Sequence, residues 1–220
     1  MPAAKKDSFK ILYEDDHILA VHKPAKMASV PAPNIPDYQT LQGKTRAWAL
    51  REGKDYTPYL LHRLDRQTSG LVLFGKYSKD REALQNMFKE PTTEKTYLAL
   101  VKWVPKQPAG TIDFPLEART SSIKVPATSH YRTFQITGNA SILEVRIETG
   151  RKHQIRKHLA MIGHPLILDR DYGDHRFDND YQRRHKGKGH FFLHAWKFEC
   201  VHPFTGERFI LVDEPMDLPK

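Results

Sequence analysis

The chain has 220 residues, of which 39% are hydrophobic, 10% aromatic and 28% charged. This composition is sufficient for a buried core and excludes a wholly disordered chain. Lys and Arg number 35 against 26 Asp and Glu, and the net charge of +9 favours a polyanionic partner, although a basic protein without a nucleic-acid partner also fits the charge alone.

Cys200 is the one cysteine, so the chain forms no internal disulfide and no zinc site built from several cysteines. It lies in the apolar run 198–201, which predicts a buried thiol. No stretch is apolar for long enough to span a membrane, and residues 1–7 lack the apolar segment of a secretory signal. We therefore expect a cytoplasmic protein.

Apolar runs bounded by polar residues, Gly and Pro predict strands along the whole chain. We expect strands at 11–13, 18–21, 59–61, 71–74, 95–101, 130–137, 141–148, 191–201 and 208–212. The first two are expected to form a β-hairpin that Lys23-Pro24 ends. The turn Gly138-Asn139 predicts a second hairpin.

Helical periodicity and capping residues predict three helices. The first lies near 41–51, and the second begins after Ser78, which is expected to be its N-cap. The third runs from about 152 to 162 with Thr149 as its cap. Gly163, followed two residues later by proline, is a stop signal for this helix.

Two segments are rich in residues that break regular structure. Residues 104–128 predict a loop-rich excursion, and the polar, basic and His-rich residues 172–189 predict a surface loop. The order of the elements predicts an α+β fold around a mixed, largely antiparallel β-sheet with flanking helices. We expect a single domain over 10–220 behind a flexible N-terminal tail at 1–9, without a separate N-terminal RNA-binding module.

Asp65 is the first candidate for chemistry. It lies in the segment 62–70, between two expected strands and between Arg63 and Arg66. Neighbouring guanidinium groups favour the ionised carboxylate, which can act as a nucleophile or a base. An aspartate in this position is also compatible with a structural ion pair or a turn.

The segment 150–159, Gly-Arg-Lys-His-Gln-Ile-Arg-Lys-His-Leu, is the second candidate. On a helix, Lys152 and Arg156 lie one turn apart on one face, as do His153 and Lys157. Such a face can grip RNA phosphates, and it can equally be a solvated basic surface. The histidines of this segment are five residues apart, which does not match the helical zinc motif with histidines four apart, so we expect no metal here.

Tyr97 is the third candidate. On the strand 95–101 it shares one face with Ala99 and Val101, because side chains alternate along a strand. A tyrosine in this position either fills the core or lines a pocket in which it stacks on a base.

Taken together, these segments resemble the RluA family of pseudouridine synthases. The residues 62–71, His-Arg-Leu-Asp-Arg-Gln-Thr-Ser-Gly-Leu, resemble that family's catalytic signature. The segments 11–24, 95–99 and 149–165 resemble its opening hairpin, its Tyr-bearing strand and its Arg-bearing helix. The four agree in order and spacing and extend over nearly the whole chain, so we expect 10–220 to be a pseudouridine synthase catalytic domain.

The resemblance implies three catalytic roles. Asp65 matches the catalytic aspartate. Tyr97 matches the tyrosine that stacks on the uracil and helps to remove the C5 proton. Arg156 matches the arginine that pairs with the aspartate and keeps it ionised.

It also implies a set of substrate-binding residues. Arg63 matches a residue that fills the space left by the flipped base. Four more residues of the matching segments are grouped with the binding site: His62, Arg66, Arg151 and His153. For His62 we expect a structural hydrogen bond rather than a chemical role.

Pseudouridine formation breaks the N1–C1′ bond, turns the uracil and rejoins it through C5. No redox step occurs, so the resemblance implies an isomerase with no cofactor, with RNA as its partner, and we expect a monomer. Within the family, 150–159, 172–174 and 202–207 are similar to TruC-type tRNA enzymes, which modify a uridine in the acceptor/TΨC stem. The middle region is shorter and the C-terminus truncated relative to those enzymes, so an rRNA substrate also stays open.

Two other classes of function remain open. One is a non-catalytic RNA-binding protein on the same scaffold. The other is a metal-dependent nuclease or hydrolase, suggested by His175, His185, His190 and Asp178, although paired carboxylates at a metal-binding spacing are missing.

Overall fold

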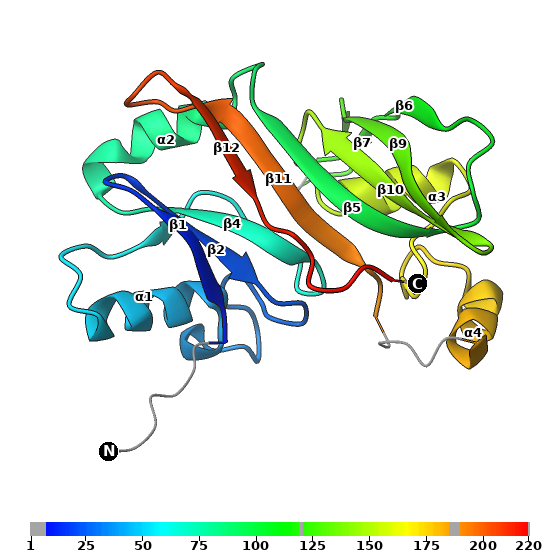
Figure 1. The fold of residues 1–220 in the computed structure, drawn as a ribbon, viewed down its shortest axis with the longest axis horizontal. Helices are drawn as coiled ribbons and strands as arrows, with labels where there is room; N and C mark the ends of the chain where they lie inside the picture. The colour runs from blue at the N-terminus through cyan, green and yellow to red at the C-terminus, as the bar shows by residue number, and fades with distance from the viewer. Residues whose placement is uncertain (1–7, 119–120, 185–189, 220) are drawn as a thin grey trace. The chain divides into compact units, whose positions relative to one another are not determined.

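The computed structural model describes residues 8–118, 121–184 and 190–219, which belong to two compact units (Figure 1). Unit 1 comprises Met1–Thr93 and Glu199–Asp213, and unit 2 comprises Glu94–Phe198 and Glu214–Lys220. The boundary falls inside strand β11 (Leu193–Val201), which contributes residues to both units. Most of the expected tail, 1–9, lies outside the described residues.

Unit 1 is built on the strands β1, β2 and β4, which pair in that order and antiparallel, with β3 antiparallel to β4 and β12 beside β11 (Figure 1). The bounds are β1 Lys10–Glu14, β2 Ile18–Lys23, β3 Tyr59–Leu60, β4 Ser69–Gly75 and β12 Arg208–Val212. The predicted hairpin of β1 and β2 is confirmed. Both β2 and β4 are buried along nearly their whole length, which explains their continuous apolar sequences.

The helices of unit 1 are α1 Leu41–Arg51 and α2 Arg81–Met87, preceded by the short 3₁₀ helices η1 Asp37–Gln39 and η2 Ser78–Asp80. Helix α1 begins where Thr40 Oγ1 accepts a hydrogen bond from Gly43 N at 3.1 Å, as an N-cap does. The prediction that Ser78 caps the second helix is wrong. A 3₁₀ turn occupies 78–80 and leads directly into α2, so Ser78 lies inside the helical segment.

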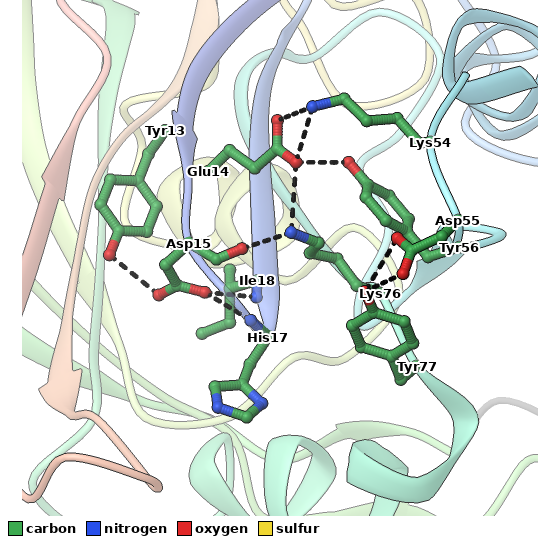
Figure 2. Close-up of polar contacts among 10 residues, drawn as sticks. All are labelled: Tyr13, Glu14, Asp15, His17, Ile18, Lys54, Asp55, Tyr56, Lys76 and Tyr77. Atoms are coloured by element: carbon green, nitrogen blue, oxygen red, sulfur yellow. Dashed lines mark hydrogen bonds and ion pairs between the residues drawn. The ribbon is translucent and has the colours of Figure 1, made fainter. Parts of the chain in front are cut away.

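Glu14 at the end of β1 is the centre of a polar network (Figure 2). Its carboxylate accepts hydrogen bonds from the Tyr56 hydroxyl at 2.7 Å, from Lys54 Nζ at 3.0 Å and from Lys76 Nζ at 3.2 Å. Burial raises the pKa of Glu14, but these three donors outweigh burial and lower it overall. The network joins the hairpin to the segment after α1 and to the residue that follows β4.

The turn between β1 and β2 is closed by Asp15. Its Oδ1 accepts hydrogen bonds from the backbone N–H groups of His17 at 2.7 Å and Ile18 at 2.6 Å, which is a typical side-chain-closed turn (Figure 2). The other oxygen, Oδ2, accepts a bond from the Tyr13 hydroxyl at 2.8 Å. Burial and this carboxylate raise the pKa of Tyr13 to about 12.

Unit 2 contains the strand order β11-β5-β10-β9-β6, in which β5 and β10, β10 and β9, and β9 and β6 pair antiparallel. The bounds are β5 Glu94–Lys102, β6 Ala109–Asp113, β9 Thr128–Thr137 and β10 Ala140–Ile147, with a separate hairpin of β7 Leu116–Glu117 and β8 Lys124–Val125. The expected hairpin around Gly138-Asn139 is confirmed. The expectation of loops over 104–128 is wrong in part, because β6, β7 and β8 lie there.

Helix α3 (Gln154–Met161) covers one face of this sheet. Its Ile155 and Leu159 pack against Ala99 and Val101 of β5, and Tyr97 lies against the same core cluster. The prediction that Tyr97, Ala99 and Val101 share a face is therefore confirmed. The α+β class, with a largely antiparallel sheet and flanking helices, is confirmed as well.

Helix α4 (His175–Arg184) contradicts the prediction of a loop over 172–189. Asp174 Oδ1 accepts hydrogen bonds from the backbone N–H groups of Arg176 and Phe177, at 3.0 and 3.1 Å, and so caps the first turn. Phe177 and Tyr181, one turn apart, then pack into a core cluster that includes Leu98 of β5. The rest of the segment, 185–189, lies outside the described residues.

Cys200 is buried, as predicted, with 2% of its surface exposed. Burial raises the pKa of its thiol to about 12, so the thiol stays protonated and unreactive at neutral pH. Across 8–118, 121–184 and 190–219, no helix is both long and apolar enough to cross a membrane.

Candidate active site

Asp65 lies in a turn directly before β4, in unit 1. The turn is closed by a hydrogen bond from Thr68 N to the Asp65 carbonyl at 3.1 Å. The preceding residue, Leu64, is buried and is held on both sides by Ser29, whose hydroxyl donates to its carbonyl at 2.8 Å and accepts from its N–H at 3.2 Å. A buried anchor therefore fixes the loop, while Asp65 itself remains partly exposed.

Lys23, the last residue of β2, is completely buried in the same unit. Its ammonium donates hydrogen bonds to the carbonyls of Met27 at 2.8 Å, Pro24 at 3.1 Å and Arg66 at 3.3 Å. Burial lowers the pKa of Lys23 to about 7, and the negative charge of Asp65 opposes this shift. Sequence reasoning missed this cation, because an isolated lysine at a strand end gives no sign of its burial.

The remaining predicted residues of unit 1 flank Asp65 on the same loop. Arg63 and Arg66 are exposed, and Arg66 Nε donates a hydrogen bond to the Lys26 carbonyl at 3.1 Å. His62 Nε2 accepts a hydrogen bond from Leu73 N at 3.1 Å, which ties the loop to β4. The guanidinium groups of Arg63 and Arg66 and the carboxylate of Asp65 therefore belong to one short segment whose two ends are fixed.

Arg156 is on α3 in unit 2 and is 5% exposed. Its Nε and Nη2 donate to the two oxygens of Asp169 at 2.6 and 2.5 Å, and Nη2 also donates to Asp171 at 2.6 Å. The guanidinium carbon lies 4.9 Å from the centre of the Tyr172 ring and 4.8 Å from that of Phe191. Two carboxylates and two aromatic rings therefore fix the orientation of this side chain.

The charge of Arg156 is permanent in this environment. Burial lowers its pKa, but the hydrogen bonds and ion pairs with Asp169 and Asp171 outweigh burial and raise it. The hydrogen bond from Arg156 in turn lowers the pKa of Asp171. Sequence reasoning missed both aspartates, although their place directly before Tyr172-Gly173 was the available signal.

The N-terminus of α3 differs from the prediction. The helix begins at Gln154, after His153 in the left-handed region at φ 55°. Thr149 does not cap the helix; its hydroxyl donates to Gln154 Oε1 at 2.7 Å. Gln154 Nε2 donates to the carbonyl of Thr128 at 2.9 Å and to Ser129 Oγ at 3.1 Å, so Gln154 anchors the helix start to β9.

Because α3 begins only at Gln154, Lys152 and His153 lie before the helix. The prediction that they share helical faces with Arg156 and Lys157 is therefore wrong. His153 Nδ1 instead lies 3.1 Å from the Tyr172 hydroxyl. Lys152 and His153 line a cleft of about 630 Å³ within unit 2, together with Lys157, Asp171 and Tyr172. Lys152 and His153 therefore reach this cleft from the loop before α3, and Lys157 reaches it from the helix.

The two other predicted residues of unit 2 are Arg151 and Tyr97. Arg151 is exposed, and its Nε donates to the Pro126 carbonyl at 3.2 Å. Tyr97 is partly buried opposite Val145 and packs against the core cluster that contains Phe191. Since Arg156 also lies over the Phe191 ring, Tyr97 and Arg156 border the same apolar cluster.

Two of the residues that suggested a metal site, Asp178 and His190, have other contacts. Asp178 Oδ1 accepts a hydrogen bond from Leu168 N at 2.8 Å, and His190 Nδ1 lies 3.0 Å from the Phe191 carbonyl. His185 lies outside the described residues. Within the described part of the chain, no three His, Cys, Asp or Glu side chains are grouped closely enough to hold a metal ion.

The chain belongs to the RNA pseudouridylate synthase family, whose model matches residues 17–161. This match confirms the resemblance to the RluA family. The matched region includes the loop of Asp65, the strand of Tyr97 and helix α3 with Arg156.

Among named relatives, the ribosomal large subunit pseudouridine synthase C of Escherichia coli strain K12 is 33% identical over 217 residues, which are 94% of this chain and 66% of that protein. The tRNA pseudouridine synthase C of Yersinia pestis is 32% identical over 233 residues, covering 94% of this chain and 87% of that protein. Of solved structures, Human RNA Pseudouridylate Synthase Domain Containing 1 matches with a TM-score of 0.75 and 21% identity, covering 100% of this chain and 88% of that chain. This last similarity shows the fold alone.

Proposed function

We propose that the chain is an RNA pseudouridine synthase, an isomerase that converts a specific uridine into pseudouridine. The observation that carries the proposal is Asp65, a partly exposed carboxylate in an anchored turn beside a buried ammonium, within the region that matches the family. The chain spans 66% of the length of the relatives named ribosomal large subunit pseudouridine synthase C.

In the proposed reaction, the Asp65 carboxylate attacks C1′ of the ribose or removes a proton from the sugar. The N1–C1′ bond breaks, the uracil turns, and a bond forms between C5 and C1′. Tyr97 offers a flat surface for the base and a phenol close to C5, from which a proton must leave while N1 gains one. The numbers of atoms and electrons in the nucleoside do not change, so no redox cofactor takes part.

Arg156 supplies fixed positive charge in this proposal. A guanidinium beside a carboxylate favours the ionised form, which Asp65 needs for either role. The contacts of Arg156 with Asp169 and Asp171 hold the side chain in place before the substrate arrives, so it needs no reorganisation during the reaction, and these two carboxylates also offset part of its charge. Lys23 adds a second positive charge, and its interaction with Asp65 is visible in the pKa of the lysine.

Substrate binding is assigned to the basic residues around these groups. The target uridine must leave its stack at a cost of a few kcal/mol, and phosphate contacts offset that cost. Arg63, exposed on the loop of Asp65, fills the space that the extruded base leaves. The other residues that we assign to RNA binding are His62, Arg66, Arg151 and His153.

A tRNA with its target uridine in the acceptor/TΨC stem is the proposed substrate. Support comes from the similarity of 150–159, 172–174 and 202–207 to TruC-type enzymes and from the relative named tRNA pseudouridine synthase C. An rRNA target is the second candidate, because relatives at 33% identity are named for the large ribosomal subunit. Carbodiimide mapping of pseudouridine in total RNA from a deletion strain distinguishes the two by the RNA that loses a site.

Asp65→Asn tests the activity itself. We expect the variant to release no tritium from RNA labelled at C5 of uridine, and to bind RNA with nearly unchanged affinity. Asp16→Asn, which alters an exposed aspartate of the β1–β2 turn, is the matched control and should react normally. Product formation by pure Asp65→Asn protein would disprove the assignment, and wild-type protein that binds RNA without isomerising any site would favour the non-catalytic alternative. Turnover that survives EDTA excludes the alternative of a metal-dependent nuclease or hydrolase.

A further inference from the structure

Lys95 is the second residue of β5, two positions before Tyr97. Side chains two residues apart on a strand leave it on the same face, so Lys95 and Tyr97 share the face that α3 covers. Opposite them on β10 lie Ile147 and Val145, both members of the buried core cluster. The side chain of Lys95 therefore leaves β5 on the face of the strand that carries the apolar cluster.

No carboxylate compensates this charge within the described part of the chain. Neither an ion pair nor a hydrogen bond involves the Lys95 ammonium there, and burial lowers its pKa without an opposing charge. The neighbouring acid, Glu94, faces the other side of the strand and bonds Arg146 Nη1 at 3.4 Å. A partly buried cation without a counter-ion reduces the stability of the folded state.

Other shielded lysines of the described chain differ from Lys95 in having acceptors. Lys23 donates to three carbonyls, Lys76 bonds Glu14, and Lys102 bonds Asp174 at 2.5 Å. A partly buried lysine that has no counter-ion within the protein is a candidate for binding an anionic ligand.

We propose that Lys95 binds a backbone phosphate of the RNA, next to the uridine whose base stacks on Tyr97. The identity of the anion rests on the proposed function, since RNA is the polyanion that this family modifies. Two residues along a strand span about 7 Å, and a flexible lysine can reach a phosphate from there while Tyr97 contacts the base of the same nucleotide. Phosphate would supply the counter-ion that the fold lacks, so the cost of burying the charge is offset only when substrate is bound.

Lys95→Met tests this role with two readouts that move in opposite directions. The substitution keeps the length of the side chain and removes its charge. If the charge serves the ligand, the thermal midpoint of the free protein should rise by about 2–4 °C. The Kd for RNA should increase roughly tenfold at low salt, and the slope of log K against log salt should fall by about 0.7–0.9.

The binding probe is a pool of unmodified tRNA transcripts, with a transcript of large-subunit rRNA in parallel. Lys95→Arg should keep the wild-type salt slope with at least one of these RNAs, because it retains the charge. Lys106→Met removes an exposed lysine of the same unit and should leave both the midpoint and the slope unchanged. A lower thermal midpoint for Lys95→Met, or a wild-type salt slope with both RNAs, would overturn the proposal.

These measurements are independent of turnover, so the proposed synthase activity and the proposed phosphate contact of Lys95 can be refuted separately. The salt titrations are repeated with Asp65→Asn, whose expected inactivity prevents conversion of the RNA during binding. A reduced slope for Lys95→Met in a protein that never forms pseudouridine would refute the proposed function and support the phosphate contact. Normal pseudouridine formation by the wild-type protein, together with an unchanged salt slope for Lys95→Met, would support the proposed function and refute the phosphate contact.

Discussion

Arg156 and Asp169 form a two-point ion pair that is almost completely withdrawn from water. The exposed fraction of the side chain is 6% for Arg156 and 0% for Asp169, and both carboxylate oxygens are engaged. Asp171 contacts the same guanidinium but is 61% exposed. The two aspartates therefore make the same kind of contact in very different environments, so their effects on stability should differ.

Replacement of Asp169 by Asn should be strongly destabilising. It leaves the buried guanidinium with one exposed carboxylate, and breaking a buried pair costs about 3 kcal/mol or more in the free energy of unfolding. Asp171→Asn is the matched control and should cost less than about 1 kcal/mol, because solvent screens an exposed pair. Urea denaturation of both variants provides the comparison. Equal losses would mean that burial does not determine the strength of these contacts.

Tyr97→Phe should separate binding from chemistry. Phenylalanine keeps the flat ring that packs on the core cluster and stacks on the base, but it removes the phenol. We expect an unchanged Kd for RNA and a single-turnover rate reduced about 100-fold, as for loss of a general acid–base group. Tyr131→Phe, another partly buried tyrosine against the same cluster, is the control and should react normally. A wild-type rate for Tyr97→Phe would assign Tyr97 to packing alone.

Most strands were predictable because each produces a local pattern. Continuous apolar runs at β2 and β4 and alternation at β9 and β10 reflect burial of both faces or one face, which the sequence shows directly. Helix α4 was not predictable in this way. Its residues are mostly polar, and its helical conformation depends on the packing of Phe177 and Tyr181 against the core cluster and on the cap at Asp174.

The candidate site shows the same division between local and long-range information. Asp65 could be singled out because its whole environment in the sequence, the segment 62–71, resembles a family signature. Its neighbour Lys23 is 42 positions away, and only the fold brings the two charges together. Asp169 and Asp171 precede Tyr172-Gly173 in the sequence, but their pairing with Arg156 is seen only in the folded chain.

Lys23 should make stability depend on pH in the alkaline range. Its folded-state pKa is about 7, below the ordinary value of about 10.4, so the unfolded chain binds more protons between these values. Under these conditions the free energy of unfolding rises with pH, and it does so until the unfolded lysine also loses its proton. Lys23→Met should abolish this rise, so the stability difference between wild type and variant should grow in favour of wild type from about pH 7 to pH 10.

Equilibrium urea denaturation at several pH values measures this difference. Lys44→Met, which alters a lysine of helix α1, serves as the control and should give a difference that does not vary with pH. A difference that is constant for Lys23→Met as well would show that the three carbonyl acceptors hold the ammonium at its ordinary pKa despite burial.

Glu14 should contribute stability that acid removes. The hydrogen bonds from Tyr56, Lys54 and Lys76 hold its folded-state pKa below the ordinary value, so the folded chain keeps the carboxylate ionised at a pH where the unfolded chain is already protonated. Its contribution is complete above the unfolded pKa of about 4.3 and is lost as the pH falls through the lower folded value. Glu14→Gln should therefore be less stable than wild type at neutral pH, and the gap should close below about pH 4.

The control for this acid-dependent effect is Glu82→Gln, which alters an exposed glutamate of helix α2 and should behave like wild type throughout the titration. Urea denaturation between neutral pH and the onset of acid unfolding gives both curves. If the gap between wild type and Glu14→Gln stays constant as the pH falls, the carboxylate is not held ionised by its three donors. The network around the β1–β2 turn would then stabilise unit 1 through the geometry of its hydrogen bonds and not through charge.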